Sequence, residues 1–176
     1  MRWLSTKDLR TEIFVLAACS LVLFFCSLIR FKIAISPIPV SLLTFAVGLL
    51  SLSLGGLRGA IVALVLLACR LSLIALRTEG FRPTPEMGYL VGMVLSSFLI
   101  GKLSESGFAN GPFRTLGILY IGSVVVLLSG AAGLSFFVPT NEILSKAVFP
   151  FLIGDLIKNV SASFLFVRIS RYLPQC

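Results

Sequence analysis

The chain has 176 residues, of which 57% are hydrophobic and 12% are charged, and its mean hydropathy is +1.06. A typical soluble domain carries about 25% charged residues, and so short a chain cannot cover this much apolar surface with so few polar side chains. The net charge of +8 is scattered between apolar runs and forms no stripe, which argues against nucleic-acid binding and favours charges that flank membrane spans.

Six apolar stretches account for most of the chain. A helix needs about 20 mostly apolar residues to cross about 30 Å of hydrocarbon, and somewhat fewer where other helices bury its ends. We therefore predict an all-α membrane protein, a bundle of six transmembrane helices in one domain over residues 1-176. The helices are expected near residues 11-29, 41-54, 59-76, 88-103, 115-134 and 150-169.

The first stretch contains Ala17, Ala18 and Ser20, small residues that allow close helix contact. They suit either packing inside the bundle or contact with a partner subunit, and the sequence leaves both open.

The connections differ between the two ends of the predicted bundle. Residues 55–58 form a predicted tight turn and residues 104–114 a short polar loop, both on the side of the amino terminus. Residues 30–40, 77–87 and 135–149 are rich in proline, so we expect irregular segments on the opposite side. Lys and Arg number eight on the amino-terminal side and six on the other. This bias favours cytoplasmic amino and carboxy termini in the plasma membrane.

The two proline-rich entries are candidate pocket walls. Backbone that is not helical at membrane depth survives only where it is buried in protein or lines a cavity, which makes Pro39 and Ser41 candidates, although an ordinary outer loop fits as well. The segment from Arg82 to Gly92 contains Thr84 and Tyr89 and leads into the fourth stretch. In that stretch, Gly88 and Gly92 have the spacing of close helix packing.

Asp155 and Lys158 are the most informative pair, because they lie inside the last apolar stretch. Ionisable residues in a span are rare and usually face the bundle interior. Three residues apart, they share one helix face, where they either form an internal salt bridge or hold a polar ligand. By topology, this pair and both proline-rich entries meet at the outer end.

Several functions are excluded by what the sequence lacks. It has no histidine, no paired carboxylates and no Ser/His/Asp set, so hydrolytic chemistry and most metal sites are not expected. No G-x-x-x-x-G-K-[ST] motif occurs, so energy for uphill transport would come from another subunit. Cys19, Cys26 and Cys69 lie in apolar runs, where we interpret them as packing residues.

Three segments together resemble the BioY family, the biotin-binding membrane (S) components of energy-coupling factor (ECF) transporters. Residues 37–42 resemble the family's P-V-P-I-T-L, and Pro83-Thr84 followed by Gly88-Tyr89-Leu90 resembles P-T-G-G-Y-L. Residues 150–158 resemble a proline-containing run that ends in G-D-x-x-K. The resemblance extends in order and spacing from about Pro37 to Asn159.

The resemblance implies a six-helix bundle that holds biotin near its outer surface without another cofactor. It implies that Asp155 hydrogen-bonds the polar head of biotin and that Lys158 contacts the ligand at its carboxylate. It also implies partners in the membrane and cytoplasm, namely a transmembrane coupling (T) component and a pair of ATPases, although some members are proposed to act without them.

The chain departs from the family pattern at three places. Leu43 stands where Gln is common, residues 85–87 interrupt the second motif, and residues 73–80 replace a glycine-rich loop. Arg77 or Arg82 is therefore a candidate partner for the ligand carboxylate, since a guanidinium can bind it through two parallel hydrogen bonds. Alternatives are an S component for another anionic vitamin, a small membrane enzyme with Asp155 as its acid, and a purely structural subunit.

Overall fold

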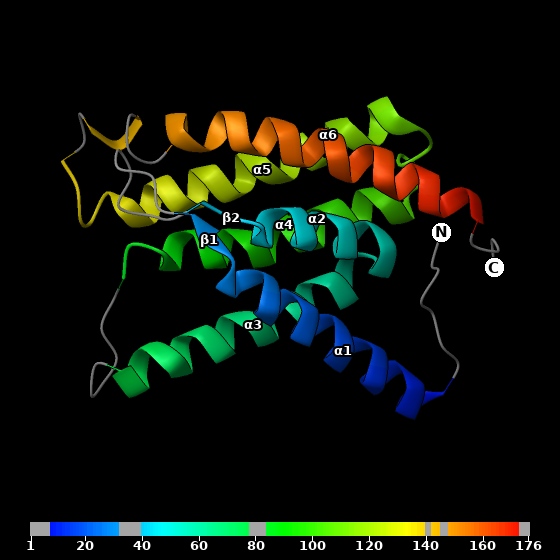
Figure 1. Ribbon diagram of the computed structural model, residues 1–176, viewed down its shortest axis with the longest axis horizontal. Helices are drawn as coiled ribbons and strands as arrows, with labels where there is room; N and C mark the ends of the chain where they lie inside the picture. The colour runs from blue at the N-terminus through cyan, green and yellow to red at the C-terminus, as the bar shows by residue number, and fades with distance from the viewer. Residues whose placement is uncertain (1–7, 32–39, 78–83, 140–141, 145–147, 173–176) are drawn as a thin grey trace.

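The computed structural model describes residues 8–31, 40–77, 84–139, 142–144 and 148–172 (Figure 1). The described residues form six α-helices and one two-stranded hairpin. The six helices were predicted, and the hairpin was not. The helices are α1 Leu9–Leu28, α2 Leu43–Leu54, α3 Gly56–Arg77, α4 Met87–Glu105, α5 Pro112–Leu134 and α6 Phe149–Tyr172, and the strands are β1 Arg30–Phe31 and β2 Val40–Ser41.

Four of these helices are long and apolar enough to cross a membrane by length and composition alone: α1, α3, α4 and α5. Helix α2 has 12 residues, and α6 has 24 residues but includes Asp155, Lys158 and Arg168. The start of α1 and the end of α6 lie at the same end of the bundle, on the right in Figure 1. The α1–α2, α3–α4 and α5–α6 connections lead from the other end, which is the predicted division of the loops.

All six helix starts differ from the predicted ones by one to three residues, and for two of them the reason is identifiable. Strand β2 pairs antiparallel with β1 and includes Ser41, so the chain is still extended at Ser41 and α2 starts at Leu43, whose N–H donates to Ser41 Oγ at 3.3 Å. Helix α3 starts at Gly56 rather than at Gly59, because the break from α2 is a single residue. Gly55 has φ +88°, a conformation that favours glycine, and its N–H bonds the Ser51 carbonyl.

Helices α4 and α5 approach closely at small residues. A Cβ on Gly88 would lie 2.6 Å from the Ser129 carbonyl oxygen and 2.9 Å from Gly133 Cα, and one on Gly92 would lie 3.0 Å from Val126 Cα. The prediction that Gly88 and Gly92 serve helix packing is confirmed. Their close approach brings the start of α4, with Tyr89, against the second half of α5.

The apolar core has two clusters arranged along the bundle. One extends over all six helices and includes Leu43, Tyr89 and Phe151 near the end of the bundle that carries the α1–α2, α3–α4 and α5–α6 connections. The other lies toward the opposite end and includes Leu52, Ile118 and Phe166. Two small cavities with polar linings lie among α2, α4, α5 and α6 near the junction of these clusters.

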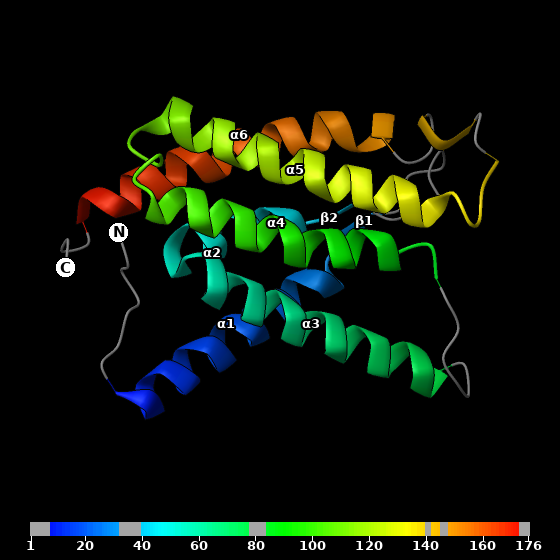
Figure 2. The ribbon, with the colours of Figure 1, turned by 180° about the vertical axis from the view of Figure 1, so that it is seen from behind.

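Helix α1 lies at the edge of the bundle, where it crosses α3 (Figure 2). The Glu12 carboxylate and Arg58 Nε join the two helices at 2.7 Å. Cys19 and Cys26 pack partly buried against the core with free thiols, as expected, whereas the Cys69 thiol is exposed.

Candidate functional site

Asp155 and Lys158 lie in the first half of α6, where Asp155 is buried and Lys158 is partly buried. Asp155 is 6% exposed, and its Oδ1 lies 3.8 Å from Lys158 Nζ. The ammonium also donates to Thr44 Oγ1 on α2, at 3.3 Å. A close charge-assisted hydrogen bond measures about 2.7–2.9 Å, so the two charges pair loosely. The expected ion pair exists, and its geometry leaves hydrogen-bonding capacity on both groups.

Both charges line a cavity of about 40 Å³. It is formed at the outer ends of α2, α4, α5 and α6, close to the hairpin. Its lining combines polar and charged side chains with apolar ones. The lining residues are Ser41, Thr44, Tyr89, Met93, Val126, Leu127, Phe151, Asp155 and Lys158. A cavity with two opposite charges on an otherwise apolar wall suits a small ligand that has polar hydrogen-bonding groups and an apolar body.

Two aromatic rings form part of this wall. The Tyr89 and Phe151 ring centroids lie 5.5 Å apart with a tilt of 37°, within the range of favourable aromatic pairs. The Tyr89 ring covers Gly130 of α5 so closely that a Cβ there would overlap it. Glycine at position 130 therefore sets the depth at which Tyr89 lies.

The structure brings together four of the eight residues predicted for the site: Ser41, Tyr89, Asp155 and Lys158. Thr84 lies just before α4, and its Oγ1 is buried without a hydrogen-bond partner among the described residues. Arg77 is the last residue of α3, and its side chain is outside the described part of the structure, as are Pro39 and Arg82.

Sequence reasoning missed the rest of the lining. Thr44 was detectable, since it is a polar residue at the start of a span directly after the two-proline segment. Met93, Val126, Leu127 and Phe151 belong to apolar runs in which nothing distinguishes a cavity wall from a packing residue. Among the described residues, no three His, Cys, Asp or Glu side chains gather as a metal site requires.

Comparisons with known proteins agree with this architecture. A solved structure described as the S-component for biotin from an ECF-type ABC transporter matches with a TM-score of 0.78 and 23% identity, over 95% of each chain, which establishes the fold. The "Biotin transporter BioY" of Thermotoga maritima is 32% identical over 88 residues. That alignment covers 49% of this chain and 51% of the relative, about half the length of each.

The family model described as "BioY family" matches residues 2–175, nearly the full length of the sequence. The fold shared with the S component and the resemblance of the three motifs agree with this match, and the chain belongs to the BioY family.

Proposed function

We propose that this protein is the biotin-binding S component of an ECF-type uptake system. The observation that carries the proposal is the loose Asp155–Lys158 pair, whose charged atoms lie 3.8 Å apart on the wall of a cavity in a BioY-family bundle. The match to the BioY family and the shared fold support a multi-pass membrane transporter subunit over the alternative of a small membrane enzyme.

The separation of the two charges supports a common role at one end of the ligand. The ureido ring of biotin carries N–H donors beside a carbonyl acceptor. Asp155, as a carboxylate, accepts from a ureido N–H. Lys158, for which the family resemblance implies contact with the ligand carboxylate, lies beside Asp155 and instead donates to the ureido oxygen as an ammonium. The apolar residues of the wall then contact the carbon and sulfur atoms of the fused rings.

The cavity holds only the inner part of the ligand. Pockets that enclose a small organic molecule measure about 300–1,000 Å³, far more than the 40 Å³ found here. The ligand chain therefore extends outward, toward the connections that precede α2 and α4. Arg77 or Arg82 meets the carboxylate there, because both positions belong to the α3–α4 connection or its border.

Uphill uptake needs partners that supply energy, since the sequence contains no phosphate-binding motif of its own. We propose a transmembrane coupling component and cytoplasmic ATPases in this role. The amino and carboxy termini are assigned to the cytoplasm on the excess of Lys and Arg at that end of the bundle. The cavity then faces outward, where it captures biotin.

Calorimetry on the purified protein in detergent tests the proposal directly. Biotin should bind with one site per chain, and a panel of other anionic vitamins should fail to displace it. If a different vitamin competes more strongly, the substrate is that vitamin. If no titrant gives heat while circular dichroism shows folded helices, the binding function is rejected.

A further inference from the structure

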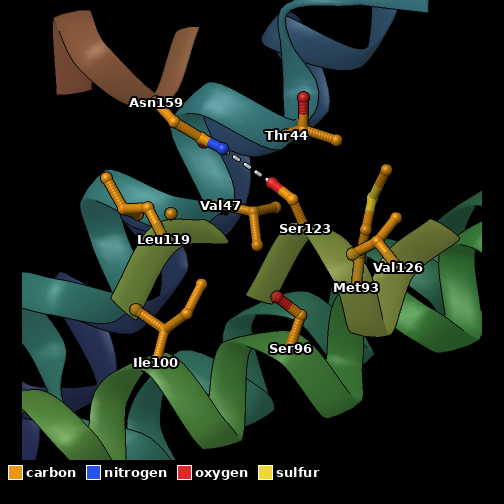
Figure 3. A pocket seen from close by; sticks show the side chains of 10 residues that line it. Thr44, Val47, Met93, Ser96, Ile100, Leu119, Ser123, Val126 and Asn159 are labelled. Carbon is orange, nitrogen blue, oxygen red and sulfur yellow. Dashed lines mark hydrogen bonds between the residues drawn. The ribbon is translucent and has the colours of Figure 1, made fainter. Parts of the chain in front are cut away.

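A second cavity lies deeper in the bundle, next to the site (Figure 3). Its lining comes from the same four helices, α2, α4, α5 and α6. Thr44, Met93 and Val126 line both cavities, so the inner one forms a floor beneath the outer one. Ser96, Ser123 and Asn159 line only the inner cavity.

The inner cavity measures about 10 Å³. A buried cavity needs about 10–15 Å³ by this measure, close to one probe sphere, to hold a water molecule. The space therefore fits one water and is too small for any organic ligand.

The lining has the polarity that a buried water requires. Asn159 is 7% exposed, and its Nδ2 donates to Ser123 Oγ at 2.8 Å, drawn as the dashed line in Figure 3. An amide offers two N–H groups and a carbonyl oxygen, so this bond uses only one of its hydrogen-bonding positions. Together with the Asn159 amide, the Ser96 and Ser123 hydroxyls give three polar groups that can bond a water in this cavity. Three is the usual number of partners for a buried water.

We propose that the inner cavity binds one ordered water, held by Ser96, Ser123 and Asn159, and that this water supports the ligand site from below. A polar group buried away from water is destabilising when it lacks a hydrogen-bond partner, and lipid offers no such partner. One water satisfies the free positions of the Asn159 amide and both serine hydroxyls at once.

The link to the ligand site runs through Thr44. Its hydroxyl accepts a hydrogen bond from Lys158 Nζ at 3.3 Å, and the side chain lines both cavities. The inner water thus lies beside the residue that orients the ammonium. Asn159 also follows Lys158 directly, so its bond to Ser123 of α5 fixes the rotation of α6 at the site. Ser123 and Asn159 are positioning residues, and this role rests on the proposed biotin site.

A ligand-free crystal structure at about 2 Å or better, grown from lipid, tests the water directly. We expect one density peak within hydrogen-bond distance of Ser96 Oγ, Ser123 Oγ and the Asn159 amide. Ser123→Ala should remove this peak and weaken biotin binding about tenfold, and Ser123→Thr, which keeps the hydroxyl, should restore both. Ser163→Ala is the matched control. Ser163 is a buried serine of α6, one turn beyond Asn159, but its hydroxyl bonds the Pro112 carbonyl.

A dry inner cavity in a map that shows other ordered waters overturns the proposal. So does an unchanged biotin dissociation constant in Ser123→Ala, because the water then has no connection to the site. If the wild-type protein binds no biotin, the proposed function fails, while the density still decides whether the water is there.

Discussion

The geometry of the Asp155–Lys158 ion pair does not suit a purely stabilising role. Removing two charges from water costs several kcal/mol each, and only close geometry with further hydrogen bonds offsets this. At 3.8 Å, with Lys158 also bonded to Thr44 at 3.3 Å, the pair lacks that closeness. A ligand that bonds both groups would supply the missing partners. Residues of this kind in a membrane bundle usually mark a substrate site.

Neutralising either charge should therefore weaken binding. Asp155→Asn and Lys158→Ala should each cost about 2 kcal/mol or more, the penalty for a buried charged partner left unpaired, which is about 30-fold in the dissociation constant. Isothermal titration with biotin measures it. Lys102→Ala is the matched control, since Lys102 pairs with Glu105 at the same three-residue spacing at the opposite end. Retained affinity in both site variants would place the ligand elsewhere.

Arg77 and Arg82 test where the ligand carboxylate lies. A hydrogen bond to a charged group contributes about 1.5–3 kcal/mol, so Arg77→Ala or Arg82→Ala should weaken biotin binding about tenfold or more. The same variant should lose little affinity for a biotin amide, which lacks the negative charge. Unchanged biotin affinity in both variants would remove the arginine hypothesis and leave the site at Asp155 intact.

At the scale of elements, the α4–α5 interface positions the aromatic wall. Gly88 packs against the backbone of Ser129 and Gly133, and the Tyr89 ring covers Gly130. Backbone atoms cannot move aside as a flexible side chain can. The glycines therefore fix the distance between α4 and α5, and the position of the Tyr89 ring depends on that distance.

Gly88→Ala should destabilise the bundle by about 1–3 kcal/mol, the usual cost of overpacking, despite the better helix propensity of alanine. Gly117→Ala on α5 is the control, because a Cβ there meets nothing within 4 Å, and we expect it to be neutral or to stabilise by up to about 1 kcal/mol. Unfolding by SDS in mixed micelles compares the two. Equal stability of Gly88→Ala and the wild type would contradict the assigned packing.

The helices were predictable because lipid imposes a length of apolar sequence on each span. All six were placed within a few residues. The shifted starts of α2 and α3 depend on the strand pairing at Ser41 and on the turn at Gly55, which apolar periodicity does not register. The site was predictable where charge stands out, at Asp155 and Lys158. Met93 and Val126 were not, since only the tertiary arrangement decides which apolar residues line a cavity.

At the scale of the whole molecule, the two ends of the bundle are built for different tasks. The outer end carries the cavities, the hairpin and the irregular connections. The opposite end is tied by tight contacts: Gly101 packs against the Gly55 backbone, the Ser104 hydroxyl donates to the Leu52 carbonyl, and the Gly56 N–H donates to Glu105. A cavity that captures the ligand at one end and a rigid opposite end suit a subunit that moves as a rigid body relative to a partner.

We propose helix α1 as the surface for that partner. The Ala17 and Ala18 side chains are exposed, so the structure does not place them in internal packing. Ala17 and Ser20 line an apolar groove of about 550 Å³ between α1 and α3, with Ile61 and Val65 on its other side. Small residues beside a groove let a second helix approach closely within the membrane, as contact with a coupling component requires.

A large side chain at this surface should abolish transport and leave biotin binding intact. Ala17→Trp or Ala18→Trp should abolish biotin uptake in liposomes that contain the complete complex, because the indole blocks close helix approach. The affinity of the purified subunit for biotin should stay within about twofold, since the cavity is lined by α2, β2, α4, α5 and α6 and not by α1. Ala132→Trp, at an exposed alanine of α5, controls for the effect of a large lipid-facing side chain. Uptake that survives in both α1 variants would exclude this face of α1 as the coupling surface and direct the search to the lipid-facing sides of the other helices.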